Sequence, residues 1–203
     1  NLPPGELYRD GLQRARFLPA IALLEQRLDV LHVDAGIDYR LRQLRQAPIY
    51  LLSADAATAA KLAALYQQLA EPHADEERHI KVGGRVISAK HRSGGVAYFS
   101  FATLCEGARS AADYGVLAQD FHTVFLSRIP LLDEHQDDAT RRFIALVDEF
   151  YDQGVKLIVS AAAAPAALYT GQRLSFEFRR TASRLVEMQS DEYLARGHLR
   201  RPD

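Results

Sequence analysis

The feature that most constrains the fold is a strand–helix–strand pattern at residues 121–164. Residues 122–127 and 155–159 are short runs of β-branched and apolar residues, which are typical of buried strands. Between them, residues 137–154 place large apolar side chains at helical spacing and charges on the other face. A connection of this length suits a right-handed crossover between two parallel strands. The sequence therefore predicts an α/β protein with this segment as its central βαβ unit.

Within the predicted helix, the sequence Leu-Val-Asp-Glu ending at Glu149 has the form of a Walker B strand end, where the Asp holds Mg²⁺ and the Glu polarises water. The apolar residues here repeat with a helical period, and no G-x-x-x-x-G-K-[ST] phosphate-binding loop occurs in the 203 residues. We therefore expect Asp148 and Glu149 to lie on the solvated face of a helix. Asp137 or Asp138 is placed to cap that helix, and Gly154 to end it.

Composition restricts the class of protein. With 48% hydrophobic and 25% charged residues the chain resembles a globular domain, and its net charge of −1 provides no overall field that attracts nucleic acid or a membrane. The single cysteine, Cys105, excludes an internal disulfide and favours a reducing compartment, and we expect it to be buried and inert. The seven histidines lack metal-site spacing, so residue chemistry alone predicts no complete active site.

Upstream of the central unit, capping and periodicity predict further elements. Pro19 suits the first position of a helix that runs to residue 28. Residues 56–70 are rich in Ala and Leu, and either Ser53 or Asp55 is placed to cap them as a helix. The shorter elements expected here are a helix at 5–10, strands at 29–33 and 49–52, and a solvated basic face at 38–45.

Residues 79–101 contain β-prone runs separated by glycine pairs, which predict an antiparallel β meander. Gly83 and Gly84 also form a weak phosphate-loop signal, but a hairpin turn is the better interpretation. Helical elements are predicted at 102–106, 111–120, 165–170, 174–187 and 190–194, followed by a frayed basic tail at 196–203. In the helix at 174–187, Phe176, Phe178 and Leu185 are the expected apolar members.

Four stretches of the chain are similar to one known family. They are LYRDGLQRARFLPAI at 7–21, DYR at 38–40, RRFIALVD at 141–148 and FRRTASRLVEMQS at 178–190. Together they resemble the ZapE family of AAA+-like P-loop ATPases, in the family's order and across essentially the whole chain. The resemblance implies that residues 1–203 are a single C-terminal segment of such a fold, with a β meander at 79–101, the parallel βαβ core at 121–164 and C-terminal helices at 174–194.

The resemblance also indicates what lies outside this chain. In the family, the Walker A loop, the Walker B strand and the sensor-1 strand precede the matched region, and Asn1 matches the Asn that ends the sensor-1 strand. We therefore expect Asn1 to contact the nucleotide, and ATP and Mg²⁺ to be bound mainly by residues upstream of it. The missing initiator Met agrees with a fragment. The intact protein is expected to hydrolyse ATP, and this fragment alone to be inactive.

Arginines carry the catalytic roles that the resemblance implies. Arg14 stands where AAA+ proteins have an arginine finger that reaches a neighbour's nucleotide, and Arg16 is the second candidate. Phe17 and Leu18 are expected to anchor this turn in the core. The opposing interpretation of the basic cluster is a solvated turn.

A second arginine is a candidate for nucleotide sensing. Arg184 lies on the last predicted helix, where AAA+-like proteins often carry an arginine that reaches a phosphate, and Arg179 or Arg180 are alternatives. A surface ion pair is the opposing interpretation of Arg184, and it would contribute about 0–1 kcal/mol.

The expected partners also follow from the resemblance. It implies a role in bacterial cell division, with the FtsZ division ring as the partner that ATP hydrolysis remodels. An arginine finger that serves the next subunit implies a homo-oligomer. The expected location is cytoplasmic, with peripheral association at the inner face of the membrane or the division site.

Two other functions fit the same residues. One is a non-enzymatic adaptor that binds protein through the meander and the helix at 56–70. The other is nucleic-acid binding through the basic residues Arg40, Arg42, Arg45, Arg200 and Arg201. The near-neutral net charge argues against nucleic acid.

Overall fold

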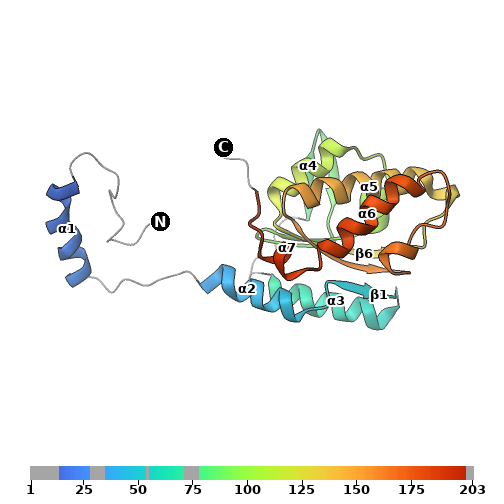
Figure 1. Ribbon diagram of the computed structural model, residues 1–203. Coiled ribbons are helices and arrows are strands. Elements are labelled where there is room, and N and C mark those ends of the chain that lie inside the picture. The colour runs from blue at the N-terminus through green and yellow to red at the C-terminus, as the bar shows by residue number, and fades with distance from the viewer. Residues whose placement is uncertain (1–13, 28–34, 54, 71–77, 200–203) are drawn as a thin grey trace. The chain divides into compact units, whose positions relative to one another are not determined.

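The computed structural model describes residues 14–27, 35–53, 55–70 and 78–199 (Figure 1). The chain divides into two compact units, residues 1–40 and residues 41–203. Asn1, the predicted helix at 5–10 and the predicted strand at 29–33 lie outside the described residues. None of the helices in the described ranges combines the length and apolar character needed to cross a membrane.

In the first unit, helix α1 (Arg14–Arg27) begins five residues before the predicted start at Pro19. The prediction was wrong because the φ angle of proline is a helical value, so the helix continues through Pro19 at the loss of one hydrogen bond. Ile21 is 5% exposed, whereas Phe17 and Leu18 are 43% and 50% exposed. Among the described residues these two side chains therefore do not anchor the segment in a core, contrary to our expectation. The basic stretch near residue 40 is helical, as part of α2 (Ala35–Gln46).

The second unit is built on a five-stranded sheet with the order β1-β7-β6-β5-β4. Its strands are β1 (Tyr50–Leu52), β7 (Lys156–Ala161), β6 (Thr123–Ile129), β5 (Val96–Ser100) and β4 (His91–Ser93). The first four run parallel to their neighbours, and β4 is antiparallel to β5. Because helix α5 (Asp137–Asp152) joins the adjacent parallel strands β6 and β7, the predicted α/β class and its βαβ unit are confirmed.

The antiparallel strands of residues 79–101 belong to two sheets. Strands β2 (His79–Val82) and β3 (Arg85–Ser88) form a separate two-stranded sheet, while β4 and β5 form a hairpin at the edge of the main sheet. Gly83 and Gly84 have φ angles of +53° and +78°, as a tight two-residue hairpin turn requires, so the hairpin interpretation of this pair is confirmed. The glycine turns in the sequence identified both hairpins. Which sheet each hairpin joins depends on residues that are distant in the sequence.

Helices cover both faces of the main sheet (Figure 1). Helix α3 (Ala56–Leu69) packs on one face, and α4 (Ala111–Asp120), α5 and α6 (Ser175–Glu187) lie on the other. Side chains of a strand alternate between faces. Accordingly Phe125 lies in the core beneath α3, and its neighbours Val124 and Leu126 lie in the core beneath α5.

Helix α5 has the predicted amphipathic character, with Phe143, Leu146 and Phe150 fully buried. Its predicted caps were wrong, because a short 3₁₀ helix (Glu134–Gln136) leads directly into α5 and makes Gln136 the capping position. The Asp137 carboxylate instead accepts a hydrogen bond of 2.9 Å from the Tyr169 hydroxyl. Gly154, with φ of +72°, follows the end of the helix as predicted.

The C-terminal helices form as predicted, with α6 followed by the short helix α7 (Asp191–Ala195). Phe178 and Leu185 are buried, but Phe176 is 76% exposed and does not join the core. The tail was expected to be frayed, yet its described residues contact the body of the unit. The Leu199 amide donates to the Gln153 carbonyl at 3.0 Å, and a ring nitrogen of His198 lies 2.6 Å from the Ala118 carbonyl oxygen.

Candidate functional site

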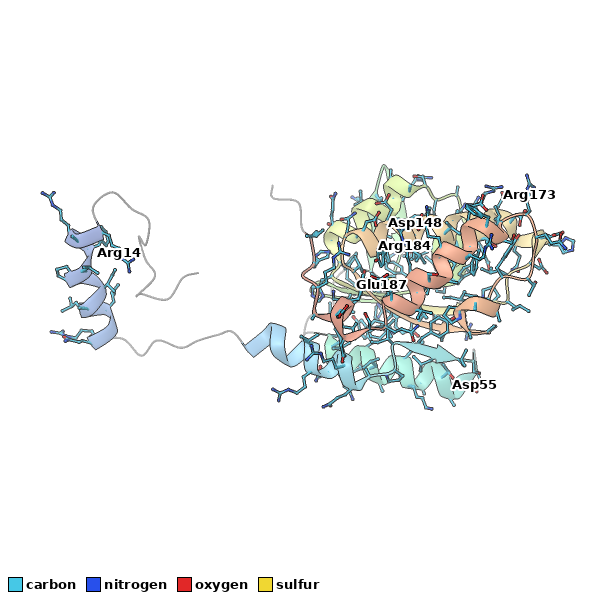
Figure 2. The ribbon with its side chains drawn as sticks, viewed as in Figure 1. Arg14, Asp55, Asp148, Arg173, Arg184 and Glu187 are labelled. Atoms are coloured by element: carbon cyan, nitrogen blue, oxygen red, sulfur yellow. The ribbon has the colours of Figure 1, made fainter. Side chains whose placement is uncertain are left out.

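A cluster of opposite charges lies where α5 contacts α6 in the second unit. Asp148 on α5 lies between two arginines of α6, with its Oδ1 atom 2.5 Å from Nη1 of Arg184 and its Oδ2 atom paired with Arg180. Arg184 also reaches Oδ1 of Asp152 at 3.3 Å. Figure 2 shows Asp148 and Arg184 side by side. Within each helix the two like-charged residues are four positions apart, so they share one face.

Aromatic packing holds Arg184 in this position. Its guanidinium lies 4.6 Å from the centre of the Tyr151 ring, which stacks on Tyr193 at 5.4 Å. The Tyr151 hydroxyl donates to Glu187 at 2.6 Å, and this hydrogen bond, followed by burial, raises the pKa of Tyr151. Arg184 is 20% exposed in its side chain and has carboxylate partners on the same unit. The geometry is that of a contact between two helices, and a nucleotide-sensing role for Arg184 stays a prediction.

Asp148 fulfils the expectation that it lies on a helix. Its α5 backbone cannot present it as the end of a strand does, and its oxygens are occupied by Arg180 and Arg184. The described residues contain no group of three or more His, Cys, Asp or Glu side chains that could hold a metal ion. Walker B chemistry at Asp148 therefore has no support in this fold.

The predicted finger residues lie in the first unit, and Arg184 lies in the second. Arg14 is the first residue of α1 and is half-buried. Arg16, two residues later in the same turn, is exposed. The first turn of α1 has no acidic residue. Asn1, the third predicted nucleotide contact of this segment, is outside the described residues.

Sequence reasoning missed a buried lysine that organises the C-terminal segment. Lys156 is 7% exposed at the start of β7, and its ammonium donates to the carbonyls of Gly154, Tyr193 and Arg196 at 2.9, 3.0 and 2.6 Å. Burial, and secondarily the charge of Arg196, lower its pKa to about 8. The sequence did contain a signal for this contact, since Lys156 stands within an otherwise apolar strand. A charged side chain that is buried in a strand must find polar partners.

Cys105 is fully buried, as predicted. Burial raises the pKa of its thiol, which keeps it protonated and a poor nucleophile. Nearby, Arg142 donates to the Cys105 carbonyl at 3.1 Å, which satisfies the end of the π-helix Ala102–Glu106. Cys105 and its surroundings therefore have a structural role in the described part of the chain.

Comparison with known proteins adds to this geometry. The family model described as AFG1-like ATPase matches residues 1–197. Cell division protein ZapE of Escherichia coli K12 is 48% identical over 199 residues, which cover 98% of this chain and 53% of that protein. Lactation elevated protein 1 homolog B of Danio rerio is 33% identical over 97% of this chain and 46% of its own length. The chain thus spans about half the length of these curated relatives. No solved structure matches.

Proposed function

Because this chain belongs to the AFG1-like ATPase family, we propose that it is part of a P-loop ATPase of bacterial cell division, in which ATP hydrolysis remodels a protein partner. The observation that carries this proposal is the 48% identity to Escherichia coli ZapE, which extends over 98% of the chain. Such a match covers both units, so the proposal applies to α1 as well as to the packed sheet.

The described residues of this chain do not form a complete site for ATP and Mg²⁺. The 203 residues contain no phosphate-binding loop, and the described ones contain no acidic or histidine cluster for a metal. We propose that other parts of the intact protein supply the phosphate cradle, and that this chain alone turns over no ATP. In-line phosphoryl transfer depends on that cradle and on the metal ions bridging the phosphates.

Arg14 is the proposed arginine finger of an AAA+-type arrangement, with Arg16 as the alternative. An arginine suits this role because it has a permanent charge and a planar fork that matches phosphate oxygens. A finger that acts on a neighbouring subunit requires a homo-oligomer. Asn1 is proposed to contact the same nucleotide from within its own subunit.

Arg184 is proposed as a nucleotide-sensing residue, although its ion pairs with Asp148 and Asp152 must then open when nucleotide binds. Measuring nucleotide affinity in full-length Arg184→Ala separates the two roles. Weaker binding supports sensing, and unchanged binding leaves Arg184 as a helix–helix contact.

The proposed partner is the FtsZ division ring, and the proposed location is the cytoplasm, at the division site on the inner face of the membrane. The name of the bacterial relative supports a role in cell division, and the partner rests on the family resemblance. The net charge of −1 gives no support to a nucleic-acid partner.

The test uses the full-length protein and the 203-residue chain. We expect full-length protein to release phosphate from ATP and to change the sedimentation of FtsZ polymers in an ATP-dependent way, while the shorter chain releases none above background. Full-length protein without turnover would contradict the ATPase proposal. Turnover by the 203-residue chain would contradict the assignment of the phosphate cradle to other residues.

One observation favours the alternative function of a non-enzymatic adaptor. A groove of about 770 Å³ runs along α6, lined by Phe178, Ala182 and Val186 among others. Val186, which lines this groove, is 59% exposed, and Phe176 on the same helix is 76% exposed. The adaptor function predicts partner binding that is independent of ATP, so the sedimentation experiment also separates the two functions.

A further inference from the structure

The carboxyl end of the central strand β6 contains a β-bulge. From Leu126 to Ile129 the strand advances three residues, while its neighbour β7 advances two, from Val159 to Ala161. Arg128 lies in this irregularity, with a left-handed φ angle of +62°. Such a backbone is strained for a residue with a Cβ atom, and bulges of this kind redirect side chains next to binding sites. The bulge turns an exposed arginine out of the sheet.

A second cation reaches the same strand end from another part of the chain. Lys90 lies in the connection between β3 and β4, and its Nζ atom donates to Oγ of Ser127 at 3.0 Å. It also lies 5.2 Å from the centre of the Tyr98 ring. Burial, and the neighbouring charge of Arg128, lower the pKa of Lys90. The fold thus brings two positive charges together at a cost in electrostatic energy.

Neither cation is neutralised within the part of the chain that the structure describes. Lys90 and Arg128 form no ion pair with a described Asp or Glu, and the Arg128 guanidinium has no hydrogen-bond partner there. The arginines of the α5–α6 contact behave differently, because Arg180 and Arg184 both meet Asp148. Because no described carboxylate neutralises these two cations, the N–H donors of Lys90 and Arg128 can bind an anion from solution.

A row of serine hydroxyls crosses three strands next to these cations. Ser100 of β5 is in register with Ser127 of β6, and Oγ of Ser160 on β7 accepts a hydrogen bond of 3.0 Å from the Arg128 amide. Ser127 and Ser160 are each 2% exposed. The row lies at the carboxyl ends of parallel strands, the edge where α/β sheets bind ligands. The side-chain hydroxyl of Ser160 donates no hydrogen bond to another described residue.

We propose that Lys90 and Arg128, supported by the Ser160 hydroxyl, form a binding site for a phosphate group carried by a small molecule or by inorganic phosphate. Two fixed positive charges match the charge of about −1.5 to −2 on a phosphate group at neutral pH. The planar guanidinium offers two parallel donors to phosphate oxygens, and the lysine offers a point charge. The site is built from residues other than Arg14 and Arg184, and it does not depend on the proposed ATPase activity.

The experiment titrates the 203-residue chain with sodium phosphate at constant ionic strength, using NaCl as the balancing salt. Backbone amide NMR signals report the location of binding. We expect saturable shifts at the amides of Arg128 and Ser160, and at least a tenfold weaker affinity in Lys90→Met and in Arg128→Gly. Parallel titrations with ADP and ATP identify the source of the phosphate. A nucleotide that binds at least tenfold tighter than phosphate indicates a nucleotide site, and equal affinities indicate free phosphate.

Arg128→Gly separates binding from folding. Glycine adopts the left-handed backbone without strain, so this variant should melt at the same temperature as wild type or higher in the absence of phosphate. Arg141→Gly is not a suitable control because α5 would be weakened, so Arg141→Ala, which removes an exposed arginine of the same unit, is the matched control. It should bind phosphate as wild type does. The proposal is overturned if wild type shows no saturable shift, or if Arg141→Ala loses as much affinity as Arg128→Gly.

Discussion

Helices α1 and α5 are similar in length, with 14 and 16 residues, but they differ in what their apolar side chains contact. On α5, Phe143 and Phe150 are completely buried against the sheet and its neighbours. On α1, Phe17 and Leu23 are 43% and 55% exposed. Helical stability in proteins derives mainly from packing of an apolar face. The comparison therefore indicates that α5 supports the fold through its buried apolar face, whereas Phe17 and Leu23 of α1 bury much less of their surface.

The largest expected effect tests the role of α1 in catalysis. Arg14→Ala in the full-length protein should bind ATP nearly normally and lose about 10³–10⁵ in turnover, because a finger acts on the charge that develops at the transferred phosphate. Steady-state phosphate release and nucleotide binding measure the two effects. Arg27→Ala is the matched control, since it removes an arginine from the other end of the same helix.

Two further results decide the identity of the finger. Mixing Arg14→Ala with a variant that lacks a functional phosphate-binding loop should restore part of the activity at shared interfaces. If Arg16→Ala loses turnover and Arg14→Ala does not, the finger is Arg16. Normal turnover in both variants would show that the basic end of α1 is only a solvated surface.

The second prediction tests the packing difference directly. Phe143→Ala should lower the free energy of unfolding by about 3–5 kcal/mol, because it removes a fully buried ring and leaves a cavity. Leu23→Ala should change it by no more than about 0.5 kcal/mol, as expected for an exposed position. Urea denaturation of the 203-residue chain measures both. A comparable loss in Leu23→Ala would show that this side chain is packed in a core.

The third prediction concerns Lys156, which fastens the C-terminal segment to β7. Its pKa is about 8 in the folded state and near 10.5 in the unfolded chain. Between these values this lysine binds more protons in the unfolded state, so its contribution to stability should rise with pH. From pH 7.5 to 9.5 this contribution should amount to a gain of about 1–2 kcal/mol, given about 1.4 kcal/mol for each pKa unit. Cys105 and the buried tyrosines, whose pKa values are raised by burial, oppose it in the upper part of this interval, so the contribution of the lysine is the difference between wild type and Lys156→Met.

Chemical denaturation at several pH values provides the measurement. Lys156→Met should reduce the slope, leaving the smaller contribution of Lys90, whose pKa is lowered in the same direction. Lys81→Met, at an exposed position of β2, should keep the slope of wild type. An unchanged slope in Lys156→Met would mean that the lysine keeps an ordinary pKa in the folded protein.

The smallest expected effect is at Asp148. In the full-length protein, Asp148→Asn should keep ATP hydrolysis within a few-fold of wild type, because this side chain pairs with Arg180 and Arg184 and not with a metal. The free energy of unfolding should fall by about 1–2 kcal/mol, since a charge-assisted contact between α5 and α6 is weakened. A loss of turnover by several orders of magnitude in a folded variant would refute this assignment.

Features that depend on nearby residues were predictable from the sequence. The apolar spacing in α5 and the short runs of β6 and β7 identified the βαβ unit before any contact was known. The cap of α3 was also predictable, because the Asp55 carboxylate accepts from the Thr58 amide at 2.7 Å within one turn. Gly83 and Gly84 marked a hairpin since few other residues adopt positive φ angles readily. In each case the residues that predict the feature lie within a few positions of the residues that form it.

The sequence by itself thus determined the α/β class, most element positions and the family. Tertiary structure alone decided which hairpin joins which sheet, that Asp148 meets the arginines of α6, and that Lys90 and Arg128 converge at the end of β6. The physical reason is that periodicity and turn geometry are properties of adjacent residues. The pairing of the parallel strands and the contact between Asp148 and Arg184 instead join residues 27 or more positions apart, and they form only when the hydrophobic core brings those segments together.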